Sequence, residues 1–473
     1  MKTLSPLDDS LVWQGEETPV DEIPAIMQRS HDAGLLWRRT DVADRIEIAR
    51  AYSAHIDANR AEITELISRE VGKLPWDAAG EVNAAVAKAA VSIQALQERR
   101  SKNSVDPGPP SRTIRYQPLG VTLVLGPFNF PLHLPGGQVI PALLAGNSVV
   151  MKPSEQATAV GQWMADAWKS VGLPDDVFQL IYGRSEPAIA AIDSPFVKGV
   201  FLTGGRGAGK AIHKQLAGRY DVLLALELGG NNPIVVCPET DAEAVGATVS
   251  FSAFISAGQR CTCARRAFFI RGAKTEQQIE SMIARTKSLR IGLPGDNPTA
   301  QVGPIISATA AENLKATYDK MVELGCREIA PWRVDERRKN LVCPSILDAS
   351  DLSDAASIEL AQLEWFGPML VIHRVDDFDT ALAKSADTSY GLAASLLGGD
   401  AKMFERFVNE VGAGVVNWNR ATTGAAGALP FGGRGHSGNH RPAGYFAIDF
   451  CGEPVASLQS ETISSDDPWA IAK

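Results

Sequence analysis

The sequence predicts an α/β protein with at least two lobes, one of them organised around a doubly wound parallel sheet. The chain has 473 residues, more than a single hydrophobic core usually organises. From about residue 120, short apolar runs alternate with amphipathic segments of helix length, which is typical of parallel strands buried on both faces and joined by right-handed crossovers. Ligands of such a sheet bind at the carboxyl ends of its strands. The apolar runs are Val121–Leu125, Ser148–Met151, Val177–Ile181, Val197–Leu202 and Val222–Leu226.

A turn-rich junction follows the last of these runs. Residues Leu228–Pro233 have the sequence Leu-Gly-Gly-Asn-Asn-Pro, and a second alternating region begins near Asp241. We therefore expect a boundary between lobes at this junction. Ahead of the first sheet, Asn59 followed by Glu62 is typical of a capping box, and it predicts a helix that ends at Gly72.

Composition restricts the functional class. Hydrophobic residues make up 45% of the chain and charged residues 21%, as in ordinary globular proteins. The net charge is -9 and basic residues form no long run, which argues against a nucleic-acid partner. The chain has no apolar stretch of about eighteen residues, and its first ten residues are too polar for a signal peptide, so we expect a cytoplasmic protein without a membrane partner. The six cysteines are sparse, and we expect mostly free thiols.

One glycine-rich segment follows an apolar run and opens a helix-like stretch. In Phe201–Lys210 (Phe-Leu-Thr-Gly-Gly-Arg-Gly-Ala-Gly-Lys), Gly204, Gly209 and Lys210 fit the spacing of a P-loop, but the next residue, Ala211, has no hydroxyl for a magnesium ion. The segment also misses the G-x-G-x-x-G dinucleotide pattern. Its glycines still allow backbone amides to approach a phosphate, with a plain tight turn as the alternative.

A cysteine in a basic segment is the candidate nucleophile. Cys261 lies in Ala257–Arg266, where three arginines predict a thiol pKa below its usual value and therefore a reactive thiolate. The alternative is a buried structural cysteine. Cys261 and Cys263 form a lone C-x-C, which lacks the ligand count of a structural zinc site, so we expect no metal.

Two polar residues follow predicted strands. Glu227 comes directly after Val222–Leu226 among apolar residues, where burial raises the pKa of a carboxyl toward that of a useful base. Asn129 follows Val121–Leu125 between prolines and aromatics, where a rigid amide suits an oxyanion. The alternatives are a hydrogen-bonded carboxylate at a strand end and a turn asparagine.

Taken in order along the chain, these stretches resemble the aldehyde dehydrogenase superfamily, from about Ile46 to Leu458. Further agreement comes from Met151–Glu155, Glu364–Pro368, Tyr390–Leu392 and Pro430–Gly433. The resemblance implies an α/β, aldehyde dehydrogenase-like fold that has a Rossmann-type cofactor lobe, an α/β catalytic lobe and a small oligomerisation arm. The implied cofactor lobe is 1–97 with 119–229, the catalytic lobe is 230–450, and the arm is 98–118 with 451–473. A homodimer or homotetramer is expected. Compared with the superfamily, the segment before about residue 20 looks short and lacks an opening strand pair.

The resemblance also implies roles for single residues. It makes Cys261 the nucleophile that forms a thioester, Glu227 the base that activates the hydrolytic water, and Asn129 the oxyanion donor. A carboxylate at Glu155 would repel a 2'-phosphate, so the implied cofactor is NAD rather than NADP. The implied cofactor-binding residues are Lys152 and Glu155 at the adenosine ribose, Gly204, Gly205 and Gly209 in the glycine loop, and Glu364 and Phe366 at the nicotinamide ribose and ring.

Within the superfamily, three long stretches resemble the branch that oxidises N-succinylglutamate 5-semialdehyde in arginine catabolism. They are Gly126–Gly146, Ala257–Arg266 and Gly414–Pro442. The partner implied by this resemblance is a small semialdehyde that carries two carboxylates. Because guanidinium groups bind carboxylates well, we expect Arg260 and Arg420 to bind it, with His440 and Arg441 as weaker candidates.

Three other functions remain open at this point. Another acidic semialdehyde, such as that of succinate or glutamate, is the alternative substrate. A non-catalytic homologue and a P-loop nucleotide hydrolase are the alternatives of a different class.

Overall fold

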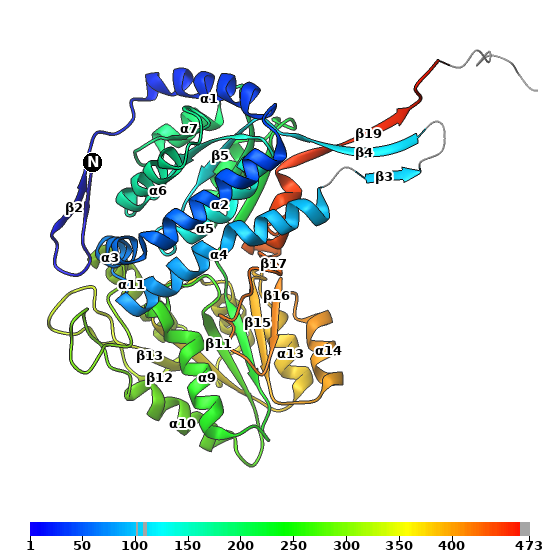
Figure 1. The fold of residues 1–473 in the computed structure, drawn as a ribbon. Helices are drawn as coiled ribbons and strands as arrows, with labels where there is room; N and C mark the ends of the chain where they lie inside the picture. Colours follow the sequence, from blue (N-terminus) through cyan, green and yellow to red (C-terminus); the bar gives the residue numbers. More distant parts are fainter. Residues whose placement is uncertain (101–102, 107–110, 464–473) are drawn as a thin grey trace, which may run out of the picture.

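The computed structural model describes residues 1–100, 103–106 and 111–463, so the predicted arm, 98–118 with 451–473, lies partly outside the described residues. Two α/β bodies lie one above the other, and a thin arm of strands projects from the upper one (Figure 1). The architecture is that of an α/β protein with a Rossmann-like lobe and a second, catalytic lobe, as predicted.

The upper body contains a five-stranded parallel sheet in the order β7-β6-β5-β8-β9. All five predicted apolar runs form these strands. The chain winds outward from β5 in both directions, because β6 and β7 lie on one side of it and β8 and β9 on the other. The strands are β5 (Val121–Leu125), β6 (Ser148–Lys152), β7 (Phe178–Leu180), β8 (Val197–Gly204) and β9 (Leu223–Leu228). The crossover helices are α5 (His133–Leu144), α6 (Thr158–Ser170), α7 (Glu186–Ile192) and α8 (Arg206–Gln215).

The lower body contains a seven-stranded sheet in the order β12-β13-β14-β11-β10-β15-β16, parallel except at β12. The first of these strands along the chain, β10, begins at Asn232, inside the predicted junction between lobes. The strands are β10 (Asn232–Val236), β11 (Ala264–Ile270), β12 (Arg327–Ala330), β13 (Ser345–Asp348), β14 (Met369–Val375), β15 (Ala393–Leu397) and β16 (Val415–Trp418). The helices are α9 (Ala242–Phe254), α10 (Thr275–Lys287), α11 (Ala308–Glu323), α12 (Asp354–Ala361), α13 (Phe378–Ala386) and α14 (Ala401–Glu410).

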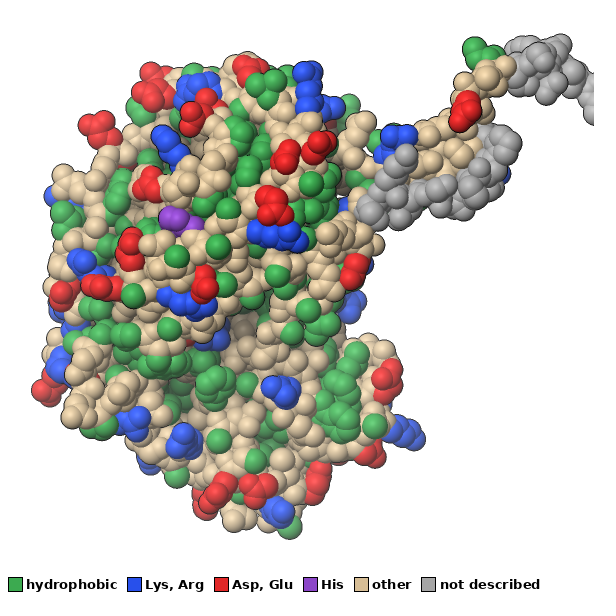
Figure 2. Space-filling view, viewed as in Figure 1, with side chains coloured by type: hydrophobic (Ala, Val, Ile, Leu, Met, Phe, Trp, Pro, Cys, Tyr) green, Lys and Arg blue, Asp and Glu red, His purple; other side chains and the backbone are tan. Residues whose placement is uncertain are grey.

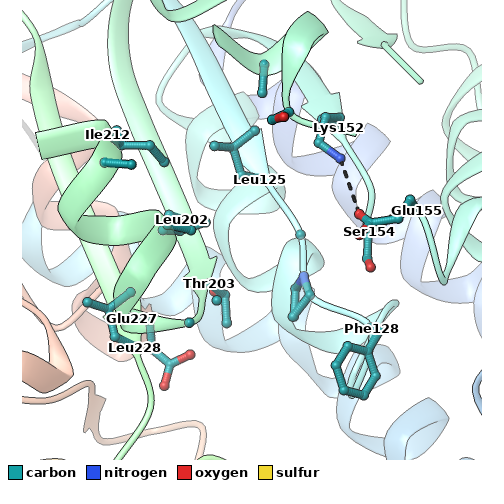
Figure 3. A pocket seen from close by; sticks show the side chains of 18 of the residues that line it. Leu125, Phe128, Lys152, Ser154, Glu155, Leu202, Thr203, Ile212, Glu227 and Leu228 are labelled. Carbon is teal, nitrogen blue, oxygen red and sulfur yellow. Dashed lines mark ion pairs between the residues drawn. The ribbon is translucent and has the colours of Figure 1, made fainter. Parts of the chain in front are cut away.

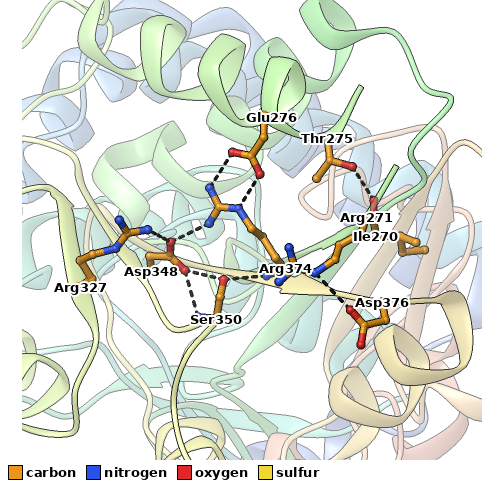
Figure 4. A network of polar contacts seen from close by, with 9 residues as sticks. All are labelled: Ile270, Arg271, Thr275, Glu276, Arg327, Asp348, Ser350, Arg374 and Asp376. Atoms are coloured by element: carbon orange, nitrogen blue, oxygen red, sulfur yellow. Dashed lines mark hydrogen bonds and ion pairs between the residues drawn. The ribbon is translucent and has the colours of Figure 1, made fainter. Parts of the chain in front are cut away.

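An ion network ties this sheet to its covering helix (Figure 4). The Asp348 carboxylate at the end of β13 accepts hydrogen bonds from Arg327 at 2.7 Å and from Arg374 at 2.6 Å. Arg374 also forms a bidentate pair with Glu276 on α10. Asp348 is buried and Arg374 is largely buried. The network therefore holds β12, β13 and β14 together and joins them to α10.

The first residues of the chain contradict one prediction. β1 (Lys2–Leu4) and β2 (Leu11–Gln14) form an antiparallel pair, so the expected lack of an opening strand pair is wrong. These strands are too short for an alternating pattern to be visible in the sequence.

Four helices follow: α1 (Ile23–Trp37), α2 (Val42–Ala58), α3 (Arg60–Val71) and α4 (Pro75–Arg99). Helix α3 ends at Gly72 as predicted, with the glycine in the left-handed region at φ +77°. Its predicted capping box is wrong. The Asn59 amide instead donates to the His55 carbonyl at 2.8 Å, because α2 ends directly before α3 begins and its last carbonyls need donors.

The arm is a three-stranded antiparallel sheet in the order β19-β4-β3. Its strands are β3 (Asn103–Asp106), β4 (Ser111–Pro118) and β19 (Gly452–Gln459). The arm extends away from both bodies (Figure 1), and Leu458 on β19 is 73% exposed. An apolar side chain this exposed on a free edge strand is a site for pairing with another chain.

The surface facing the viewer in Figure 2 has acidic and basic side chains intermixed. The six cysteines are free thiols, as predicted. Among the described residues, no helix is long and apolar enough to cross a bilayer.

Candidate active site

A cavity of about 950 Å³ lies between the two sheets. Its walls come from the carboxyl ends of β5, β6, β8 and β9 and from segments that precede β11 and β14, so strands of one sheet end where strands of the other begin. Figure 3 shows Lys152, Thr203 and Glu227 projecting from three of these strands around one space. The cavity brings together most predicted catalytic and cofactor residues: Asn129, Lys152, Glu155, Gly204, Gly205, Glu227, Cys261, Glu364 and Phe366.

Cys261 is positioned by a strained turn. The 3-10 turn Ile255–Gly258 that follows α9 places Ser256, Ala257 and Gly258 at positive φ. A Cβ on Gly258 would overlap the Gly367 carbonyl, so a larger residue would push the turn away from the segment that precedes β14. Cys261 therefore comes out of this turn just before β11, partly exposed in the cavity wall.

Glu227 lies at the end of β9 beside Cys261. Its side chain is buried, and its Oε1 has no hydrogen-bond partner. Burial raises the pKa of Glu227 to about 8, and the nearby Glu364 carboxylate adds to this. Burial, followed by the charge of Glu227, also raises the pKa of the Cys261 thiol well above its usual value. A carboxylate with this pKa is matched to accepting and returning protons near neutral pH.

The prediction that three arginines lower the pKa of Cys261 is wrong. Arg260 forms an ion pair with Asp77 at 2.7 Å. Arg265 and Arg266 are buried on β11 and donate to main-chain carbonyls, including those of Gly258 and Asn231. Burial and the charge of Glu227 therefore dominate the pKa of the Cys261 thiol over these guanidinium groups.

Asn129 reaches the same region from the loop after β5. Its Nδ2 donates to the Gln259 carbonyl at 2.9 Å, which ties the amide to the segment that carries Cys261. An amide has two hydrogens, so one remains for a ligand in the cavity that Asn129 lines. This geometry suits an oxyanion formed on a carbonyl carbon attached to Cys261.

The predicted ribose-binding pair lies at the end of β6. Lys152 Nζ donates to the carbonyls of Pro153 and Gly183, at 3.0 and 2.9 Å, and lies 3.9 Å from the Glu155 carboxylate. Both side chains line the cavity (Figure 3). The half-exposed Glu155 is therefore free to accept hydrogen bonds from hydroxyl groups.

The glycine loop leads into α8 with its amino end at the cavity. Gly204 and Gly205 line the wall, and a Cβ on Gly205 would meet open space. Gly209 does not line the cavity, and its role in cofactor binding stays a prediction. A Cβ there would lie 2.9 Å from Leu228, so Gly209 lets α8 pack closely on β9.

Glu364 and Phe366 complete the wall from the segment before β14. A Cβ on Gly229 would overlap the Glu364 carboxylate, which explains the small residue that follows Leu228. Burial raises the pKa of Glu364. The Phe366 ring packs edge-on against Phe128, with 6.0 Å between ring centres.

Comparison with known proteins agrees with this geometry. The model of the aldehyde dehydrogenase family matches residues 1–454. The chain belongs to the aldehyde dehydrogenase family. It is therefore an oxidoreductase, and enzymes of this family use nicotinamide cofactors.

The similar curated proteins share one name. The chain is 43% identical to N-succinylglutamate 5-semialdehyde dehydrogenase 1 of Caulobacter vibrioides, over 93% of this chain and 92% of that protein. It is 39% identical to the enzyme of the same name from Burkholderia multivorans, over 97% and 93%. Among solved structures, an NADP-dependent glyceraldehyde-3-phosphate dehydrogenase from Bacillus halodurans, complexed with NADP, matches with a TM-score of 0.88 and 26% identity, over 98% and 96%.

None of the four predicted substrate residues of this aldehyde dehydrogenase lines the cavity. Arg260 is held by Asp77 and by the Ser256 hydroxyl at 2.8 Å. Arg420 is exposed after the carboxyl end of β16. His440 is exposed, whereas Arg441 donates to the Gly433 carbonyl at 2.6 Å. Their role in substrate binding stays a prediction.

Two supporting residues were missed by the sequence reasoning. The Asn232 amide donates to the carbonyls of Cys261 and Cys263, at 2.7 and 2.8 Å. The buried Arg265 donates to the carbonyls of Gly258, Arg260 and Gly367. Both hold residues 255–263, which we call the catalytic turn, through main-chain atoms. The sequence signal for Asn232 was its place in the Leu228–Pro233 junction, and Arg265 had no signal besides its charge.

Among the residues that the structure describes, no group of three or more histidine, cysteine, aspartate or glutamate side chains is placed to hold a metal ion.

Proposed function

We propose that this aldehyde dehydrogenase oxidises N-succinylglutamate 5-semialdehyde to N-succinylglutamate with NAD, through a thioester on Cys261. The observation that carries the chemistry is the pairing of a cavity-exposed Cys261 with the buried Glu227 beside the Asn129 amide. The substrate is inferred from the shared name of relatives that are 37 to 43% identical to this chain. Succinate or glutamate semialdehyde is the second candidate, since it presents the same aldehyde beside fewer carboxylates.

The first half of the proposed reaction begins with a proton transfer. Cys261 gives its thiol proton to Glu227, and the thiolate attacks the aldehyde carbon to form a hemithioacetal oxyanion. Asn129 and the Cys261 main-chain amide stabilise that oxyanion. A bound nicotinamide cofactor supplies the hydride acceptor that converts the adduct into a thioester.

The second half releases the acid. After Glu227 has released the thiol proton to solvent, it takes a proton from water, the hydroxide adds to the thioester carbon, and the Cys261 thiolate leaves. Among the described residues Glu227 Oε1 has no hydrogen-bond partner, so this oxygen is left to accept the proton of that water. The net reaction converts one aldehyde and one water into one carboxylate and two protons, and the aldehyde carbon loses two electrons as hydride.

The described residues fit a dinucleotide. The amino end of α8 and the Gly204–Gly205 turn present main-chain amides to the cavity, as a pyrophosphate requires. Lys152 and Glu155 would hold the adenosine ribose, and Glu364 and Phe366 the nicotinamide ribose and ring. NAD is preferred because the Glu155 carboxylate accepts hydrogen bonds from ribose hydroxyls and repels a 2'-phosphate.

We further propose that the arm pairs with a second copy of the chain in a homodimer or homotetramer. The support is the free edge of β19 with its exposed Leu458. In this scheme the cofactor lobe is 1–97 with 119–229 and the catalytic lobe is 230–450. Light scattering of the full chain, compared with a chain ending before β19, tests the assembly.

A steady-state assay tests the function. NADH formation is measured with N-succinylglutamate 5-semialdehyde, succinate semialdehyde, glutamate semialdehyde and propanal, each with NAD and with NADP. The expected result is the highest kcat/KM for the succinylated substrate with NAD. A higher kcat/KM for propanal would refute the substrate proposal, and equal use of NADP would refute the proposed role of Glu155.

A further inference from the structure

A cluster of cationic side chains lies next to Asn129 but outside the cavity wall. Phe130, which follows Asn129, has Lys73 Nζ 3.3 Å and the Arg260 guanidinium carbon 5.2 Å from its ring centre. His133, the first residue of α5, lies beside the same ring, with 6.3 Å between ring centres.

Lys88 extends this cluster along α5. A Cβ on Gly137 would lie 3.5 Å from Lys88 Nζ, so the ammonium from α4 packs against α5 one turn beyond His133. Burial, followed by the charges of Lys88, Lys73 and Arg260, lowers the pKa of His133 well below its usual value, so its ring is neutral at neutral pH. We call Lys73, Lys88 and Arg260, which surround this neutral ring, the cationic cluster.

Two of its cations are neutralised by buried carboxylates. Lys73 pairs with Glu81 at 2.6 Å, and Arg260 pairs with Asp77 at 2.7 Å. The second Glu81 oxygen accepts the main-chain amide of His133 at 3.1 Å. These pairs account for both carboxylates that α4 contributes at the cluster, so their role is to hold α4 against α5 and the catalytic turn.

Lys88 has no such partner. Its side chain is 5% exposed, and among the described residues it makes neither a hydrogen bond nor an ion pair. Burial lowers the pKa of Lys88 to about 8, so Lys88 carries its charge in most protein molecules at neutral pH. A buried, uncompensated ammonium is unfavourable unless an anion joins it.

Another polar atom nearby also lacks a partner. The buried Nδ1 of His133 has none. The loop after β16 also packs on α4, where a Cβ on Gly427 would lie 3.7 Å from Val91, one turn from Lys88. Buried polar groups are normally satisfied, so the unpartnered Lys88 ammonium and His133 Nδ1 on adjoining helices are available to a polar ligand.

We propose that Lys88, with His133 beside it, binds the terminal carboxylate of the substrate's succinyl group. The inference rests on the proposed function, because it assigns a carboxylate of that substrate. In N-succinylglutamate 5-semialdehyde, the glutamate carboxylate is near the aldehyde and the succinyl carboxylate is remote from it. Lys88 packs about 6 Å farther along α5 than His133, on the side away from Asn129, and so suits the remote group. Lys88 is thus a specificity residue rather than a participant in the chemistry.

The test compares Lys88→Met with the wild-type enzyme on three aldehydes. N-succinylglutamate 5-semialdehyde has both carboxylates, N-acetylglutamate 5-semialdehyde lacks the terminal one, and propanal has none. We expect kcat/KM for the succinyl substrate to fall by about ten- to a hundredfold, mainly through KM, since a charge-assisted hydrogen bond is lost. The two other aldehydes should change by less than about twofold. Lys315→Met is the matched control, because Lys315 pairs with Asp319 on the exposed side of α11 and should alter none of the three values.

Thermal unfolding separates binding from structure. Replacing an uncompensated buried charge by an apolar chain of similar length should leave Tm unchanged or raise it. A lower Tm with equal losses on all three aldehydes would make Lys88 a structural residue and overturn the inference. Equal losses on the succinyl and acetyl substrates alone would assign Lys88 to the glutamate carboxylate and also overturn it.

The same data keep the two proposals apart. If the wild-type enzyme does not prefer the succinyl substrate to the acetyl analogue, the proposed function itself fails. If the wild-type enzyme shows that preference and Lys88→Met keeps it, only the role of Lys88 is refuted.

Discussion

The Glu227 carboxylate and the Cys261 thiol lie side by side in the cavity wall, and burial raises the pKa of both groups. An isolated thiol in this position would stay protonated. Next to a carboxylate with a pKa of about 8, the thiol has a proton acceptor of suitable strength. We therefore expect the reactivity of Cys261 to depend on Glu227, rather than on the arginines that surround it in the sequence.

Cys261→Ala should abolish dehydrogenase activity, whereas Cys263→Ala should keep most of it. Cys261 is exposed to the cavity, but Cys263 is buried with its thiol directed to the Ile255 carbonyl. The measurement is NADH formation, with NAD binding by fluorescence in the same samples to confirm folding. Substantial turnover by the Cys261 variant would rule out the covalent mechanism.

Glu227→Gln keeps the shape of the side chain and removes the base. Both hydride transfer and hydrolysis should then slow, because Glu227 accepts the thiol proton of Cys261 and later a proton from water. Rapid mixing should show a slower NADH burst, of about one per site, followed by slow turnover. A burst as fast as that of the wild-type enzyme would assign the activation of Cys261 to another group and leave Glu227 as the base for hydrolysis alone.

The pH profile follows from the raised pKa of Glu227. The carboxyl group is protonated and inactive as a base below about 8, and it becomes a carboxylate above that pH. Steady-state kcat should therefore rise with pH through about 8 wherever hydrolysis limits the rate. In Glu227→Gln this rise should be absent. A wild-type profile that is flat between pH 6 and pH 9 would contradict the assigned role.

Arg420→Ala tests the exposed arginine after β16. We expect kcat/KM for the dianionic semialdehyde to fall by about ten- to a hundredfold, because a charge-assisted hydrogen bond to a carboxylate is lost. Propanal, which has no carboxylate, should lose much less. Equal losses for both aldehydes would show that Arg420 supports structure. Arg434→Ala, at another exposed arginine of the same region, is the control.

Much of the first sheet followed from local pattern. Each of the five apolar runs forms a strand within two residues of the predicted ends. Strands buried on both faces need continuous apolar sequence, so their pattern survives without knowledge of their neighbours. The short β1–β2 pair left no such pattern, because its stability comes from pairing across a turn rather than from burial.

The candidate catalytic residues were predicted from their order along the chain and their resemblance to a family. Burial of Glu227 was a local inference, since the residues on either side of it are apolar. Two expectations failed. The Asn59 amide turns to the His55 carbonyl at the end of the preceding helix, and the arginines near Cys261 contact Asp77 or main-chain carbonyls instead of the thiol.

The sequence by itself determined the alternation of strands and helices, and it predicted the strand ends at which ligands bind and the catalytic roles of Cys261, Glu227 and Asn129. Only the tertiary structure decided which charges are compensated. Asp77 and Glu81 on α4 neutralise Arg260 and Lys73, and Lys88 has no partner among the residues that the structure describes. The order of segments and the hydrophobic pattern can be read along the sequence without knowledge of the fold. A pKa or a charge balance depends on burial and on partners brought together from distant segments, and only folding brings these together.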